Sequence, residues 1–112
     1  MTYQAPLADM GFALKYGAGL TAALEEGFFG ELTMDDVEAV LGEAGRIAGE
    51  VLAPLNRIGD REGVTFKDGA VTTAPGWKEA YQTWCKGGWN GLVAESEWGG
   101  QALPHVLNAG CV

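Results

Sequence analysis

Residues 33–55 read TMDDVEAVLGEAGRIAGEVLAPL and decide the fold class of this 112-residue chain. Apolar residues recur there at steps of three and four, with charged residues between them, which is typical of an amphipathic helix. Thr33 stands three residues before Asp36 in a capping-box-like arrangement, and Asp35 and Asp36 suit the positive end of a helix. We therefore expect one long helix from Thr33, whose apolar stripe faces the core. The stripe comprises Val37, Val40, Leu41, Ala44, Ile47, Ala48, Val51, Leu52 and Leu55.

Proline and glycine residues shape both ends of this helix. Pro54 removes a backbone donor, but Leu55 still falls on the stripe, so we expect Pro54 to kink the last turns rather than end them. Upstream, Pro6 favours an extended lead-in over residues 3–10. A short helix is expected from Asp9, and Gly17 with Gly19 weakens its continuation.

The segment after the long helix changes to a β pattern. Two β-prone runs, residues 64–67 and 70–72, flank Asp68-Gly69, a pair that supplies the positive φ angles of a tight turn. We expect a small two-stranded hairpin, packed on the helices because such a hairpin is marginal alone.

Aromatic residues mark the next predicted helix. Thr73 and Pro75 open it, and Gly87-Gly88 ends it. Its ring-bearing residues recur at steps of four and three on one face: Trp77, Tyr81 and Trp84.

The last quarter of the chain is rich in turn-forming residues. Residues 89–100 predict an ordered loop held by its aromatic rings, and Pro104 opens a further helix. That helix reaches the last residue, Val112, after about two turns. A helix of this length is marginal in isolation, so we expect the chain to end within a longer helix. The tail 108–112 does not continue a clear helical pattern.

Composition narrows the class of protein. With 47% hydrophobic and 20% charged residues, the chain is expected to form one domain. A formal net charge of -8 repels phosphate backbones and argues against nucleic acid as a partner. No apolar stretch reaches the roughly 20 residues of a membrane span, and the first residues do not support a secretory signal, so we expect a cytoplasmic protein. Cys85 and Cys111 are expected to be reduced thiols without paired metal-ligand spacing.

Four stretches of the chain together resemble the amino-terminal region of acyl-CoA dehydrogenases, in the subgroup with an extra segment before the helical domain. The resemblance covers nearly the whole chain. Its stretches are the lead-in from Tyr3 to Phe12, the long helix from Glu43 to Gly63, the hairpin and helix start from Phe66 to Tyr81, and, most specific, residues 88–104.

The resemblance implies a mainly α fold, a helical up-down-type domain with one small β-hairpin, which is a fragment of the family's amino-terminal domain. We expect a single domain over residues 1–112, with residues 1–32 as the extension and 33–112 as part of the helical domain. Departures concern the specific loop, where the family usually has Pro-Glu-Tyr-Gly-Gly at the positions of Ser96 to Gly100, and Gly at the position of Ala102.

In complete members, similarity implies FAD-dependent α,β-dehydrogenation of acyl-CoA thioesters. A carboxylate base removes the α proton while the flavin takes the β hydride. The base, the flavin-contacting β-domain and most of the acyl tunnel are expected beyond this chain. We therefore predict no catalytic, cofactor-binding or metal residue here, no FAD bound to this chain alone, and acyl-CoA as a ligand in the complete enzyme.

Several residues invite a functional interpretation that their neighbours do not support. His105, the single histidine, has no nucleophile at the right spacing, so a helix-start or solvated role is favoured. The carboxylates are better explained as helix caps and surface charge than as acid-base pairs or a cation site. They are Glu25, Glu26, Asp35, Asp36, Glu95 and Glu97.

The glycines near the carboxyl end and the aromatic residues also allow a structural and a functional interpretation. No GxGxxG or P-loop pattern follows a strand, so turn-forming roles are favoured over a phosphate cradle for Gly87, Gly88, Gly91, Gly99 and Gly100. The aromatic stripe of Trp77, Tyr81 and Trp84 could stack on a flavin, but rings at helical spacing usually form core, and core is our prediction.

Two functions stay open at this point. The first is a fragment of an acyl-CoA dehydrogenase-like flavoenzyme, inactive alone. The second is a stand-alone helical module for protein interaction or dimerisation. For the fragment we expect a homo-oligomer formed through exposed apolar helix faces, because a large uncovered apolar surface is uncommon on a soluble monomer. The module would bind a partner or another copy through such faces.

Overall fold

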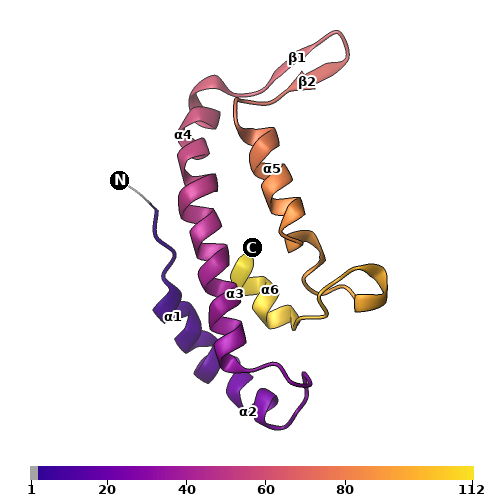
Figure 1. The fold of residues 1–112 in the computed structure, drawn as a ribbon. Coiled ribbons are helices and arrows are strands. Elements are labelled where there is room, and N and C mark those ends of the chain that lie inside the picture. The colour runs from indigo at the N-terminus through magenta and orange to yellow at the C-terminus, as the bar shows by residue number, and fades with distance from the viewer. Residues whose placement is uncertain (1–2) are drawn as a thin grey trace.

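The computed structural model describes residues 3–112, and Met1 and Thr2 of the predicted extension lie outside it. The fold is mainly α with one two-stranded antiparallel sheet, as expected (Figure 1). The molecule measures 55 × 37 × 18 Å, with a radius of gyration of 16.9 Å. A compact domain of this length would have a radius of about 13 Å. The helices therefore form an open, elongated arrangement rather than a closed globule.

The long helix predicted from Thr33 runs without a break through three segments: α3 (Met34–Ile47), the π-helical η2 (Ala48–Leu52) and α4 (Ala53–Glu62). Its capping box is confirmed: the Thr33 N–H donates to Asp36 Oδ2 at 2.9 Å, and the Asp36 N–H donates to Thr33 Oγ1 at 3.2 Å. The wider hydrogen-bond spacing of η2 comes just before Pro54 and accommodates its missing donor. The helix ends at Gly63, whose φ is +64°.

Two short helical regions precede α3. Helix α1 (Leu7–Phe12) begins two residues before the expected Asp9 and passes into the π-helical η1 (Ala13–Gly17), so the extended lead-in is shorter than predicted. Helix α2 (Leu20–Glu25) was not predicted from the sequence. It starts directly after Gly19, whose φ of +67° redirects the chain, and it is anchored by the buried Leu20.

The core lies around the first half of the long helix. One cluster joins α3 to η1, α2 and α6 (His105–Cys111). Its fully or nearly buried members are Leu14, Leu20, Val37, Leu41 and Leu107. A second cluster joins α3 to the loop after α5 and contains Ala44, Ile47, Trp89 and Leu92. Beyond Ile47 the predicted stripe is only partly covered: Val51 is half-buried and packs against the second cluster, whereas Leu52 is 42% exposed. The expectation of a stripe that faces the core along its whole length was therefore wrong for Leu52.

The hairpin is confirmed, with β1 (Thr65–Lys67) paired antiparallel to β2 (Ala70–Thr72). Asp68 and Gly69 have φ values of +51° and +79°, as a two-residue turn of this kind requires. Its predicted packing on the helices was wrong. Every residue of both strands is exposed, and the hairpin projects away from the helical body (Figure 1).

Helix α5 (Trp77–Lys86) starts after Gly76 rather than at Pro75, because Gly76 has a φ of +86° and ends the turn that precedes the helix. It closes at Gly87-Gly88 as predicted. The following loop contains two single turns of 3-10 helix, η3 (Trp89–Gly91) and η4 (Ser96–Trp98). Trp89 is buried and holds this loop, whereas Trp98 is 81% exposed and does not.

Helix α6 extends from His105 to Cys111, so most of the tail is helical despite Asn108 and Gly110. Tertiary packing explains this difference from the sequence pattern. Leu107 is fully buried, and a Cβ added to Gly110 would lie 2.9 Å from Leu41 Cδ2, so the glycine allows a close approach to α3.

Candidate functional site

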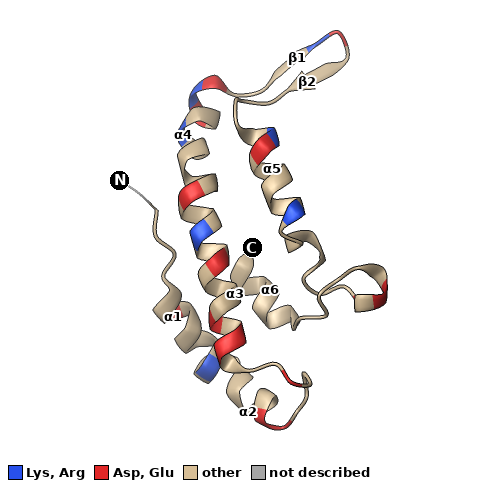
Figure 2. Ribbon diagram, in the orientation of Figure 1, with Lys and Arg blue, Asp and Glu red and all other residues tan. Residues whose placement is uncertain are grey.

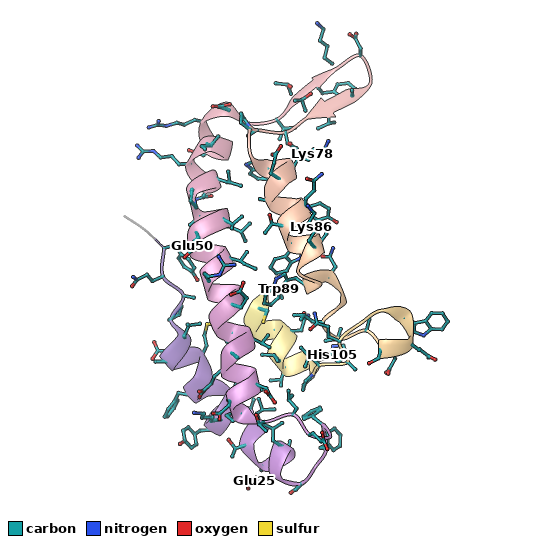
Figure 3. All side chains as sticks on the ribbon, in the orientation of Figure 1. Glu25, Glu50, Lys78, Lys86, Trp89 and His105 are labelled. Atoms are coloured by element: carbon teal, nitrogen blue, oxygen red, sulfur yellow. The ribbon has the colours of Figure 1, made fainter. Side chains whose placement is uncertain are left out.

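An apolar groove of about 510 Å³ lies between the long helix and α5. The long helix forms one wall and α5 the other, and the end of α6 lies at the groove (Figure 3). Asn56 contributes an amide, and no lining residue is charged. The groove is lined by Ala44, Ala48, Leu52, Leu55, Asn56, Trp77, Ala80, Tyr81, Trp84, Cys111 and Val112.

Two glycines set the spacing where α4 and α5 meet. A Cβ added to Gly59 would lie 2.6 Å from Trp77 Cζ2, so the bare glycine lets the indole rest on the helix backbone. A Cβ added to Gly76 would lie 2.7 Å from Leu55 Cδ2. The two helices are therefore held at a fixed distance by contacts that larger side chains would prevent.

The aromatic stripe of α5 lines this groove. The prediction that it forms core was wrong for Trp77 and Tyr81, whereas Trp84 packs against the second cluster. Trp77 and Tyr81 are 44% and 64% exposed. Trp84 is half-buried and stacks on Trp89 with 5.3 Å between ring centroids, and its Nε1 donates to Asn90 Oδ1 at 2.8 Å. The rings are exposed because no element of residues 3–112 covers that side of α5.

The structure places the other predicted candidates apart from the groove. His105 is the exposed first residue of α6. Glu25 and Glu26 lie at the end of α2, and Glu95 and Glu97 lie in the exposed loop around η4. In residues 3–112, no three or more His, Cys, Asp or Glu side chains are grouped so as to hold a metal ion.

Asp36 at the start of α3 has a structural role. Asp36 accepts the backbone N–H of Thr33, and this hydrogen bond, with that from the Thr33 side chain, lowers the pKa of the Asp36 carboxyl. A charged carboxylate at a helix start also interacts favourably with the helix dipole. The cap interpretation of Asp36 agrees with this geometry.

Four of the five glycines near the carboxyl end take conformations or contacts that only glycine allows easily, and Gly91 is the exception. Gly88 and Gly99 have φ values of +76° and +82°. A Cβ on Gly87 would lie 2.6 Å from Trp89 Nε1, and one on Gly91 would lie 3.6 Å from the Gly100 Cα. These are turn and packing functions.

The two cysteines are free thiols in different environments. Cys85 is exposed, and its Sγ accepts a hydrogen bond from Asn90 Nδ2 at 3.2 Å. Cys111 lies at the groove, and burial raises the pKa of its thiol. A raised pKa disfavours the thiolate, which is the nucleophilic form.

No charged side chain lines the groove, and three ion pairs lie on the surface of the described residues. Arg46 donates to Glu43 and Glu50, with a shortest contact of 2.6 Å between its Nη2 and Glu43 Oε1. Lys15 Nζ lies 2.7 Å from Glu38 Oε1 and joins η1 to α3. Such exposed pairs contribute little to stability. Helix α6 carries no Lys, Arg, Asp or Glu and is uniformly tan in Figure 2.

The helices of residues 3–112 are too short or too polar to span a membrane. No protein-family model matches the chain. It is 39% identical, over 109 residues and 97% of its length, to 3-methylmercaptopropionyl-CoA dehydrogenase of Ruegeria pomeroyi. The chain belongs with the acyl-CoA dehydrogenases. It spans about 18% of that relative's length and so corresponds to one segment of such an enzyme.

The loop that precedes α6 folds back on itself through backbone hydrogen bonds. The Gln101, Ala102 and Leu103 N–H groups donate to the carbonyls of Gly91, Ala94 and Leu92 at 2.9, 2.9 and 2.8 Å. A Cβ on Gly100 would collide with the Ala94 carbonyl oxygen, which explains the glycine there.

The departures from the acyl-CoA dehydrogenase pattern have visible consequences in this loop. Ala102 adopts a φ of +51°, in the left-handed region that favours the glycine usual in the family. Trp98 replaces the usual tyrosine at an 81% exposed position, where the larger ring meets no steric conflict. The loop therefore keeps a closed path, with backbone strain at Ala102.

Proposed function

We propose that this chain is the amino-terminal helical layer of an FAD-dependent acyl-CoA dehydrogenase and is inactive without the rest of the enzyme. The similarity over 97% of the chain carries the proposal. In such an enzyme a carboxylate base and the flavin perform the oxidation, while this layer supports them. Acyl-CoA and FAD are then ligands of the complete cytoplasmic enzyme, with a role in the metabolism of fatty acyl groups.

The open groove supports a role as one layer of a larger protein. Layers of secondary structure are stable when their apolar faces are covered by another element. Here Trp77, Tyr81 and Leu52 leave 44%, 64% and 42% of their surface exposed. A supporting layer needs such a face, whereas a catalytic site needs converging polar groups.

Exchange of segments tests this function. The matched region of the Ruegeria relative is replaced by residues 1–112, and the chimera is purified beside the intact relative and the relative without that region. We expect the chimera to bind flavin and to reduce a dye acceptor with the relative's own acyl-CoA substrate. The isolated chain, dialysed against FAD, is expected to be colourless. A chimera that melts cooperatively but lacks flavin would overturn the proposal.

We propose further that the isolated chain forms a homo-oligomer through its apolar helix faces, including the tail from Pro104 to Val112. A two-fold interface lets the same patch cover itself. The net charge of -8 opposes this association, but salt screens charges beyond about 8 Å. Light scattering over a dilution series is the test, and a monomeric mass at high micromolar concentration would contradict it.

A further inference from the structure

The groove between the long helix and α5 is suited to bind an apolar helix. Its lining contains no charged side chain. Ala44 and Ala80 form buried floor positions at 9% and 6% exposure, and small residues allow a helix backbone to approach closely. Leu52, Trp77 and Tyr81 stand as partly exposed walls. A charged ligand would lose its hydration here without gaining an oppositely charged side chain.

The end of α6 leads directly into this groove. Cys111 and Val112 are part of its lining, and Val112 is 86% exposed. Figure 1 shows the carboxyl end of α6 between the long helix and α5. The direction of α6 is fixed because Leu107 is fully buried and Gly110 lies close to Leu41. A chain that continues α6 therefore enters the groove without a turn.

We propose that the groove seats a helical continuation of α6 in the longer protein, a segment with small and aliphatic residues toward both walls. This inference rests on the proposed function, since it needs a chain that continues past Val112. The 10 residues of α5 set the depth of the seat, about 15 Å of helix. An occupant of about 15 residues, about 22 Å long, would pass the whole wall.

A second copy of the chain is a weaker occupant of the same groove. It would bring another net charge of -8 and would lose the freedom of an independent molecule. A continuation of α6 is attached at the mouth of the groove, so its effective concentration there is high. Continuity of the chain and the apolar lining therefore both favour the helix over a second copy.

A peptide titration tests the seat. The probe is a synthetic peptide of about 15 residues, copied from the Ruegeria relative immediately after the matched region, long enough to span the groove. The 112-residue chain carries Trp98→Phe, which removes an exposed indole outside the groove. Because Trp77 and Trp84 line the groove, we expect a saturable blue shift of tryptophan emission and a gain of helical circular dichroism.

Matched variants locate the binding. Tyr81→Ser removes a 64% exposed ring from the groove, and Phe66→Ser removes a 74% exposed ring from the hairpin. We expect roughly tenfold weaker peptide binding for Tyr81→Ser and no change for Phe66→Ser, because a central aromatic anchor dominates an apolar interface. A peptide of the same composition in scrambled order, without helical spacing, is expected not to bind.

Three results would overturn the inference: no blue shift, equal binding by both serine variants, or equal binding of the scrambled peptide. A blue shift that depends on protein concentration and that the peptide does not displace would assign the groove to a second copy instead. Each of these leaves the chimera experiment unaffected. A flavin-binding chimera with no peptide binding would retain the proposed function and reject the helix seat.

Discussion

Replacement of Leu41 by alanine tests whether the first half of the long helix forms the core. Leu41 is 2% exposed and shares a cluster with Leu14, Leu20 and Leu107 from three other elements. Loss of three buried carbons removes about 2.4 kcal/mol of transfer free energy. Neighbours anchored on separate elements cannot collapse fully into the space, so a cavity term brings the expected loss to about 3 to 4 kcal/mol.

Urea denaturation followed by far-ultraviolet circular dichroism measures this loss. With an m-value of roughly 2 kcal/mol/M, the midpoint should fall by about 1.5 to 2 M. Protein concentration is held constant, because self-association would add to the apparent stability. Leu52→Ala is the matched control, the same change on the same helix at a 42% exposed position, with an expected loss of about 1 kcal/mol. Equal losses, or a loss below about 0.5 kcal/mol for Leu41→Ala, would refute the assignment of the core.

Other predictions concern the helix cap, acid sensitivity and the helix junction. Thr33→Ala should lower the free energy of unfolding by about 0.5 to 2 kcal/mol in the same assay, and Thr33→Ser should preserve it. The folded pKa values of Asp36 and Glu43 lie below their ordinary values of 3.8 and 4.5, so their stabilisation is complete above those values and is lost as pH falls through the folded values. Thermal unfolding from pH 6 to pH 2 should show this loss, and stability that rises on acidification would contradict it. Gly59→Ala should displace Trp77 and shift the tryptophan emission of the protein to the red, and an unchanged spectrum would contradict the close contact between Gly59 and Trp77.

The parts of the fold that sequence predicted are those with local chemical causes. Thr33 and Asp36 cap one another, and Asp68-Gly69 forms its turn from its own φ preferences, so a few neighbouring residues decide both features. Helix α2 escaped prediction because it is only 6 residues long and follows Gly17 and Gly19, which locally disfavour a helix. Its stability comes from Leu20, which packs on residues distant in the chain. That packing is absent from any local pattern.

The candidate site was missed for a related reason. The spacing of Trp77, Tyr81 and Trp84 correctly indicated one helix face, but spacing does not say what covers that face. Pro54 and Ala102 show the same dependence on context, since a π-helical segment accommodates the first and a closed loop holds the second at positive φ. The sequence contains the apolar residues of both predicted helices that line the groove. It does not contain the distance between the two helices, so the groove itself could not be predicted.

The division of the long stripe connects the fold to the proposed function. From Val37 to Ile47 the stripe is buried by elements within this chain, but Leu52 is left 42% exposed. Helical periodicity continues unchanged across this boundary, which indicates that the second half is as suited to burial as the first. Where the apolar pattern of a helix continues but the elements packed on it end, we expect a further apolar element to pack there. The groove lies there, with the end of α6 at its mouth, and the relative's chain is more than five times longer than the region matched. The partly exposed half of the stripe therefore supports our proposal that this layer packs against a further apolar segment in the complete enzyme.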